Sequence, residues 1–107
     1  MQIKSDIVQG RKVWNLDNDA VILTVMEGGG HIAGLRVKSG PRVNPYWTPV
    51  WKGMEPWEYR QTDAKRYGVQ LLAAIKGHNL CLSAFGTPSP EEERAGLGNH
   101  GEAPVLR

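Results

Sequence analysis

The 107-residue sequence predicts an all-β fold with one or two short helices, and three observations lead to this prediction. Thirteen glycines and seven prolines make up about 19% of the chain, against roughly 12% in average proteins, which favours turns and short strands. Residues 11–38 are rich in the β-branched side chains typical of strands. Helical signals are confined to two short segments further on. The length suits one modest core, so we expect residues 1–107 to form a single domain.

The first part of the chain carries the strand signals. A triplet of turn-forming residues, Asp17, Asn18 and Asp19, separates two apolar runs and predicts a hairpin. The second run is apolar on both faces, which is typical of a strand covered from two sides. Three glycines at 28–30 then end it, and alternation of apolar and polar residues resumes. The predicted strands, in order, are residues 13–16, 20–26 and 31–38.

Residues 39–60 are predicted to form an ordered loop without regular structure. Three prolines at 45, 49 and 56 exclude a continuous helix or a central strand, because each lacks an N–H group. The loop also holds five of the eight aromatic rings, which argues against disorder.

Two segments carry helical signals. A weak stripe of apolar residues at helical spacing predicts a helix within residues 61–76, with Gly77 as its stop. Residues 89–96 are clearer: Ser89 suits the N-cap, Glu92 completes a capping box, and Gly96 ends the segment. After it, the chain from residue 100 is expected to be extended, as a terminal strand with an open edge.

Charge and hydropathy exclude several classes of partner. The 13 Lys and Arg and 11 Asp and Glu residues leave a net charge of +2, and neither half of the chain is strongly polarised, so we expect no nucleic-acid partner. No stretch approaches the ~18 apolar residues of a membrane span, so we expect no membrane partner. The first six residues lack the apolar region of a signal peptide, and the default expectation is a cytoplasmic location.

Metal and cofactor motifs are weak. Cys81 is the only cysteine, so we expect a small buried hydrophobe and no intramolecular disulfide. His78 lies three residues before it, but no second pair of close ligands follows, and the glutamates at 91–93 are better explained as capping charges. The glycines at 28–34 depart from the dinucleotide fingerprint. We therefore expect no metal site and no cofactor.

The aromatic loop and the last histidine are the candidates for function. Indole faces next to Asn, His and Glu side chains suit a neutral sugar, whose C–H faces pack on the ring and whose hydroxyls form hydrogen bonds. The alternative is a loop that plugs the core or forms an interface. His100 has an imidazole that can transfer a proton near neutral pH, and Gly101 allows close approach of a ligand. The alternative for His100 is a structural role.

Five motifs follow one another along the chain: GGGHIAGLRV (28–37), NPYWTPVW (44–51), GHNLCL (77–82), SPEEERAGL (89–97) and HGEAP (100–104). Together they resemble the first third of proteins of the galactose mutarotase-like superfamily, specifically bacterial aldose 1-epimerase-related sequences, over residues 10–107. The resemblance implies an antiparallel β-sandwich, of which this chain would be the amino-terminal part, and a concave face that binds a monosaccharide and interconverts its anomers without a cofactor. It implies that His100 is catalytic. The implied substrate-binding residues are Trp47, Glu102, Asn44 and His78.

The chain departs from the family in two respects. The second histidine and the glutamate base of such enzymes lie beyond the segments that this chain matches, so the general base is not named. Glu102 also replaces the second glycine of the commoner His-Gly-Gly motif. Three functions are therefore weighed: an epimerase that needs further segments, a carbohydrate-binding module without turnover, and a protein that forms homo-oligomers through the Trp-rich loop or open sheet edges. The sugar hypothesis requires the indole-rich loop and His100 to meet on one concave surface.

Overall fold

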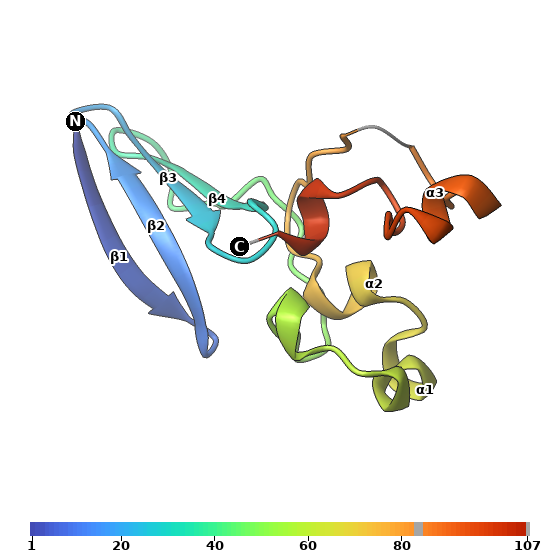
Figure 1. The fold of residues 1–107 in the computed structure, drawn as a ribbon. Helices are drawn as coiled ribbons and strands as arrows, with labels where there is room; N and C mark the ends of the chain where they lie inside the picture. The colour runs from blue at the N-terminus through green and yellow to red at the C-terminus, as the bar shows by residue number, and fades with distance from the viewer. Residues whose placement is uncertain (83–84, 107) are drawn as a thin grey trace.

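A computed structural model of the chain describes residues 1–82 and 85–106 (Figure 1). Its main element is one antiparallel sheet of four strands, which neighbour one another in the order of the chain. The strands are β1 (Gln2–Val8), β2 (Arg11–Asp17), β3 (Val21–Met26) and β4 (Ile32–Val37). Short helices follow: η1 (Pro56–Glu58), η2 (Gln61–Asp63), α1 (Ala64–Tyr67), α2 (Gln70–Ala74), α3 (Pro90–Arg94) and η3 (Ala103–Val105). The predicted antiparallel β-structure with short helices is confirmed, but a sandwich is not, because the described residues form one sheet.

The predicted hairpin is present. Its register runs from Val13 opposite Met26 to Asp17 opposite Ile22. In the turn, the Asn18 side chain accepts hydrogen bonds from the backbone N–H groups of residues 20 and 21, at 2.9 and 2.8 Å. This local bond explains why a sequence of Asp and Asn residues marks the turn. The second strand is only partly covered, since residues 21–25 are half-buried, and the expectation of cover from both sides is wrong there.

β1 is a strand that sequence patterning did not predict. Six of its seven residues are exposed, and Ile3 and Ile7 are 59% and 63% exposed. Gln9 and Gly10, both at positive φ, form the two-residue turn into β2, the conformation that favours a tight hairpin. Figure 1 shows β1 at the outer edge of the sheet. Its place therefore comes from pairing with β2 rather than from a buried face.

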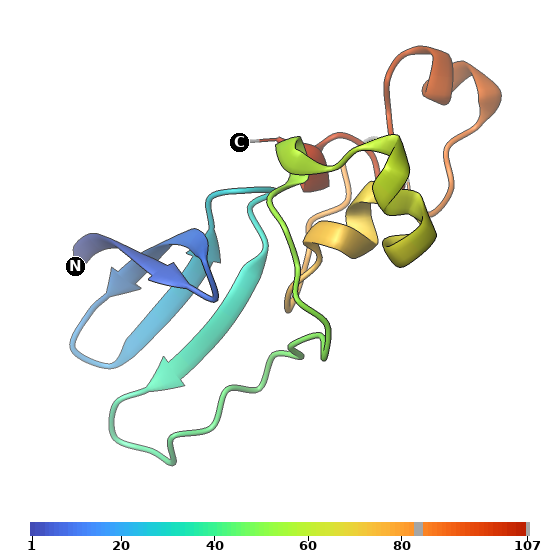
Figure 2. The same cartoon turned by 90° about the horizontal axis from the view of Figure 1, so that it is seen from below.

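The core lies at one end of the sheet. Val13, Met26 and Ala33 form a fully buried cluster there, with Val8 packed against it. Ala33 sits at a register shift in the pairing of β3 with β4, which turns it toward this cluster. A second buried group lies on the helical side and includes Tyr67, Leu71, Ala73 and Ala74. Figure 2 shows the helices gathered beyond this end of the sheet, not over its length.

One close backbone approach joins the two parts. Ile32 and His78 exchange N–H to C=O hydrogen bonds of 2.8 and 3.0 Å. The neighbouring Gly77 has φ +63°, and a Cβ atom there would overlap the carbonyl oxygen of Ile32. A side chain at position 77 would push the two segments apart, so glycine is required by this contact as well as by its positive φ.

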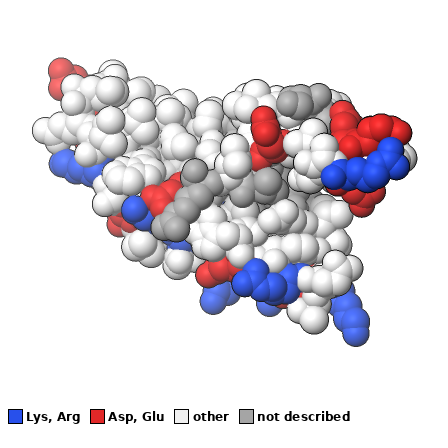
Figure 3. All heavy atoms as spheres, viewed as in Figure 1, with Lys and Arg blue, Asp and Glu red and all other residues white. Residues whose placement is uncertain are grey.

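The predicted helix within residues 61–76 is broken into short pieces. Gly68, at φ +79°, separates α1 from α2, and α2 ends at Ala74, before Gly77. The second helical prediction is confirmed: the Ser89 hydroxyl accepts from the N–H of Glu92, and the Glu92 carboxylate accepts from the N–H of Ser89. Figure 3 shows acidic groups of α3 beside a cation at one tip of the molecule, where Arg94 pairs with Glu91 at 3.0 Å.

The end of the chain corrects one expectation. Residues 103–105 form the turn η3 instead of an extended strand. The N–H of Gly29 donates to the carbonyl of Leu106 at 2.7 Å, so this segment folds back on the glycine turn after β3. Among the described residues, β1 is an edge strand with no further strand paired on its outer side.

Candidate functional site

The residues predicted to bind sugar are held by different contacts. Asn44 fixes the loop after β4 to that strand: its amide donates to the Ala33 carbonyl at 2.9 Å, and its oxygen accepts from the N–H groups of Leu35 and Tyr46 at 3.3 and 3.1 Å. His78 pairs through its backbone with Ile32, and its side chain is exposed. Asn44 thus has a structural role in this fold, and sugar binding by either residue stays a prediction.

Trp47 lies at the surface of the aromatic loop. Its side chain is 52% exposed, and its ring meets the Trp51 ring edge to face, with 5.6 Å between centroids. Its carbonyl accepts a 2.8 Å hydrogen bond from the N–H of Gly77. Trp51 is more firmly held, because its indole N–H donates to the Leu72 carbonyl at 3.1 Å.

His100 lies in a different set of contacts. The residue is half-buried at φ +65°, and its Nδ1 is 2.9 Å from the Sγ of Cys81. The Phe85 ring meets the imidazole edge to face at 5.1 Å. Cys81 is half-buried, so the prediction of a small buried hydrophobe is wrong. Glu102 is exposed. The contacts of His100 thus connect it to Cys81 and Phe85, while those of Trp47 connect it to Trp51 and Gly77.

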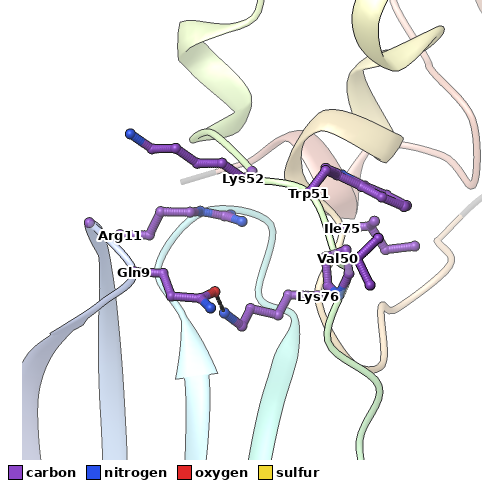
Figure 4. Close-up of a pocket in the computed structure, with 10 residues that line it drawn as sticks. Gln9, Arg11, Val50, Trp51, Lys52, Ile75 and Lys76 are labelled. Atoms are coloured by element: carbon purple, nitrogen blue, oxygen red, sulfur yellow. Dashed lines mark hydrogen bonds between the residues drawn. The ribbon is translucent and has the colours of Figure 1, made fainter.

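A cavity of about 450 Å³ opens elsewhere, where three segments distant in sequence meet (Figure 4). The β1–β2 turn forms one side, the end of the aromatic loop another, and the segment after α2 a third. Trp51 lines it, whereas Trp47 and His100 do not. The lining residues are Gln9, Gly10, Arg11, Pro49, Val50, Trp51, Lys52, Gly53, Ile75 and Lys76.

Two buried cations face this cavity. Arg11, the first residue of β2, is 5% exposed and donates from Nη1 to the Ala74 carbonyl at 2.8 Å. Its Nε lies 3.5 Å from a carboxylate oxygen of Glu55, which is also buried. Lys76 is 6% exposed, and its ammonium donates to the side-chain oxygen of Gln9. Burial, and next the charge of Arg11, lower the pKa of Lys76.

His31 supports the wall behind these cations. It is fully buried, and its Nδ1 accepts a hydrogen bond of 3.0 Å from the N–H of Lys76. Burial, with a smaller effect of the Arg11 charge, lowers the pKa of His31 from 6.5 to about 4. The imidazole is therefore neutral near pH 7, and Nε2 carries its proton, because Nδ1 is the acceptor. A neutral His31 adds no charge beside Arg11 and Lys76.

Sequence patterning did not single out Arg11, Lys76 or Gln9. Arg11 and Lys76 are 65 positions apart in the chain, and neither belongs to one of the motifs identified in the sequence. The signal that was available, the aromatic loop, indicated the correct segment but a different indole, Trp47 in place of Trp51.

Comparisons with known proteins leave the family open: no protein-family model, curated protein or solved structure matches the chain. The resemblance to mutarotase-like proteins therefore stays a prediction. Among the described residues, none of the helices has the length and apolar character needed to cross a bilayer. In the same part of the chain, no group of three or more His, Cys, Asp or Glu residues is arranged to hold a metal ion.

Proposed function

We propose that this protein binds a small carbohydrate in the cavity between the β1–β2 turn and the end of the aromatic loop. The observation that carries the proposal is a cavity of about 450 Å³ that has Trp51 among its lining residues. This volume falls within the roughly 300–1,000 Å³ of small-molecule sites. Apolar side chains of Val50 and Ile75 share the lining with polar groups of Gln9 and Lys52, the mixture that a sugar's faces and hydroxyls require.

Rigidity of the indole supports this proposal. The bond from Trp51 to the Leu72 carbonyl fixes the ring before any ligand arrives, and the edge-to-face contact with Trp47 holds it from a second direction. A ring that is already ordered loses little conformational entropy when a sugar packs on it. Trp51 is therefore better suited to hold a ligand than the more exposed Trp47.

Binding without turnover is the form of the proposal that the cavity favours. Anomer interconversion needs a general acid and a general base at the sugar. The described residues that line the cavity include lysine and arginine but no histidine or carboxylate. His100 is engaged with Cys81 outside this lining, so the cavity does not meet the condition, stated from the sequence, that the indole-rich loop and His100 share one surface. The present proposal rests on the Trp51 cavity instead. Mutarotase activity, the antiparallel β-sandwich and a cytoplasmic location stay predictions.

Saturation-transfer NMR on the full chain tests the proposal, with glucose and galactose as probes. We expect saturable binding that weakens at least tenfold in Trp51→Ala and less in Trp51→Phe, which keeps an aromatic face. Trp57→Ala is the matched control, because Trp57 is 39% exposed and lies in η1, outside the cavity lining. Circular dichroism confirms that each variant is folded. Absence of saturable binding, or equal weakening in the Trp57 variant, would contradict the proposal.

A second candidate function, self-association, is favoured by the open edge of β1. If two copies of β1 pair antiparallel about a two-fold axis at Ser5, Lys4 of one copy lies opposite Asp6 of the other. In the same register Ile3 lies opposite Ile7. Both of these cross-strand pairs are of a favourable kind, and backbone groups of the two edges become hydrogen-bonded to each other. The N–H of Ile7, which now donates to the Asp6 carboxylate, would exchange that bond for one to the other copy. The central part of the strand, residues 3–7, is thus complementary to itself in charge and hydropathy, which favours a second copy of this chain as the partner of this edge.

A charge-swap series tests this second candidate. Sedimentation velocity of the full chain is expected to show a dimer that Lys4→Glu dissociates, since the substituted carboxylate would then face Asp6 of the other copy. The double variant Lys4→Glu/Asp6→Lys is expected to restore the dimer, because the opposite charges face each other again. A chain that stays monomeric at every concentration, or a dimer indifferent to Lys4→Glu, would contradict β1 pairing.

A further inference from the structure

The Arg11 guanidinium lacks a full set of partners. Nη1 donates to the Ala74 carbonyl, and Nε lies 3.5 Å from Glu55 as an ion pair without a hydrogen bond. Nε, Nη2 and both Glu55 carboxylate oxygens are buried without a hydrogen-bond partner among the residues that the structure describes. A buried guanidinium donor left without an acceptor is costly, and native proteins avoid it unless a water, ion or ligand completes the site. Arg11 lines the cavity.

A second buried cation faces the same space. Figure 4 shows the Arg11 side chain between Lys52 and the hydrogen-bonded pair of Lys76 and Gln9. Lys76 and Arg11 are both almost fully buried, and both line the cavity. Glu55 balances one of these charges but does not line this cavity. The lining therefore holds an excess of positive charge that no described carboxylate in it neutralises.

We infer that the carbohydrate held in this cavity carries an anionic group, a carboxylate or a phosphate, which the guanidinium of Arg11 and the ammonium of Lys76 bind together. The inference rests on the proposed function for the sugar ring and adds the chemical class of the ligand. An anion between the two cations supplies an acceptor for Nη2 and offsets their mutual repulsion. The planar guanidinium of arginine can bind a carboxylate or a phosphate through two parallel hydrogen bonds, and lysine adds a point charge.

Different parts of the cavity lining would contact the sugar ring and the anionic group of such a ligand. Arg11 lies on the side of the β1–β2 turn, and the Lys76 ammonium reaches Gln9 there, although Lys76 itself belongs to the segment after α2. Trp51 and Val50 come from the aromatic loop, and Ile75 comes from the segment after α2. The sugar ring packs on the indole and its charged group extends toward Arg11. Lys52 is exposed at the cavity, where its charge attracts an anion before it enters.

Isothermal titration calorimetry of the full chain tests the inference with four probes: glucose, glucose 6-phosphate, glucuronate and inorganic phosphate. We expect at least one charged sugar to bind tenfold or more tighter than glucose, and the comparison of the two charged sugars tells phosphate from carboxylate. Lys76→Met is expected to reduce that preference at least tenfold. The control is Lys65→Met, an exposed cation on α1 away from the cavity, which is expected to leave the preference unchanged.

Arg11→Met would leave the buried Glu55 carboxylate without its cation and could unfold the chain. Arg11→Lys is therefore the second variant, because it keeps the positive charge and loses the paired donors of the guanidinium. We expect it to weaken binding of the charged sugar while the chain stays folded. Equal affinity for charged and neutral sugars, or equal losses in the Lys65 and Lys76 variants, would overturn the inference and leave sugar binding intact. Inorganic phosphate bound in the absence of any sugar binding supports the cation pair and overturns the carbohydrate proposal. Binding of none of the probes overturns both.

Discussion

Acidification is expected to destabilise this protein through one buried histidine. Burial lowers the pKa of His31 from 6.5 to about 4, so between these pH values the unfolded chain binds a proton that the folded chain does not. Stability rises with pH wherever the unfolded state binds more protons, and it is therefore lost as pH falls from 6.5 toward 4. At 1.36 kcal/mol per pKa unit, the loss is about 2 kcal/mol at pH 5 and about 3 kcal/mol at pH 4. For a domain stable by about 5–15 kcal/mol, this is a large share.

Urea denaturation followed by circular dichroism at several pH values from 7 to 4 measures this loss. The control is His31→Gln, whose side-chain oxygen can still accept the N–H of Lys76 but does not titrate. We expect the free energy of unfolding of the native protein to fall more steeply than that of the variant across this range. Both chains share every other titrating group. Among these is Asp17, whose pKa is lowered from 3.8 by its hydrogen bond with Lys38 and therefore lies below the pH range of this experiment. Parallel pH profiles for the two chains would refute the assignment to His31.

Three further predictions concern packing and local bonds, each measured by chemical denaturation. Gly77→Ala is expected to lower the free energy of unfolding by about 3 kcal/mol or more, because the new Cβ overlaps the Ile32 carbonyl. Gly30→Ala is the control: Gly30 has a similar positive φ but no atom within 4 Å of the new Cβ, so the expected loss is about 1–2 kcal/mol. Similar losses in the two variants would argue against the close approach at Gly77. Met26→Ala, in the fully buried cluster, is expected to cost about 2–5 kcal/mol, and a loss under about 1 kcal/mol would contradict its core position. Asn44→Ala is expected to cost about 1–2 kcal/mol and to speed amide exchange in the loop after β4, and unchanged exchange would contradict its anchoring role.

Features that depend on neighbours in the chain could be predicted. The turn at residues 17–19 is specified by the Asn18 side chain, which bonds to backbone two and three positions on. The helix at 90–94 is specified by Ser89 and Glu92 in the same way. The strands β2 to β4 followed from their apolar patterns, because one of their faces is at least partly buried. β1 was missed since its residues are exposed, and exposure removes the hydrophobic pattern that patterning depends on.

For the candidate site, too, the sequence indicated some features and only the packing of distant segments determined the others. Sequence composition directed attention to the aromatic loop, and Trp51 of that loop does line the cavity. It could not show that Trp51 and not Trp47 is the lining indole, nor that Cys81 and His100 lie 2.9 Å apart, because both depend on how distant segments pack.

By itself, the sequence determined the order of turns, strands and caps, because these depend on hydrogen bonds and side-chain patterns within a few residues. Only the tertiary structure determined which charged side chains come together at the site. Arg11 and Lys76 belong to segments with no local reason to be buried, and only the packing of the β1–β2 turn against residues 49–53 and 75–76 removes both from water. The physical reason is that the cost of burying a charge, and hence its need for an anion, is set by surroundings assembled from the whole chain.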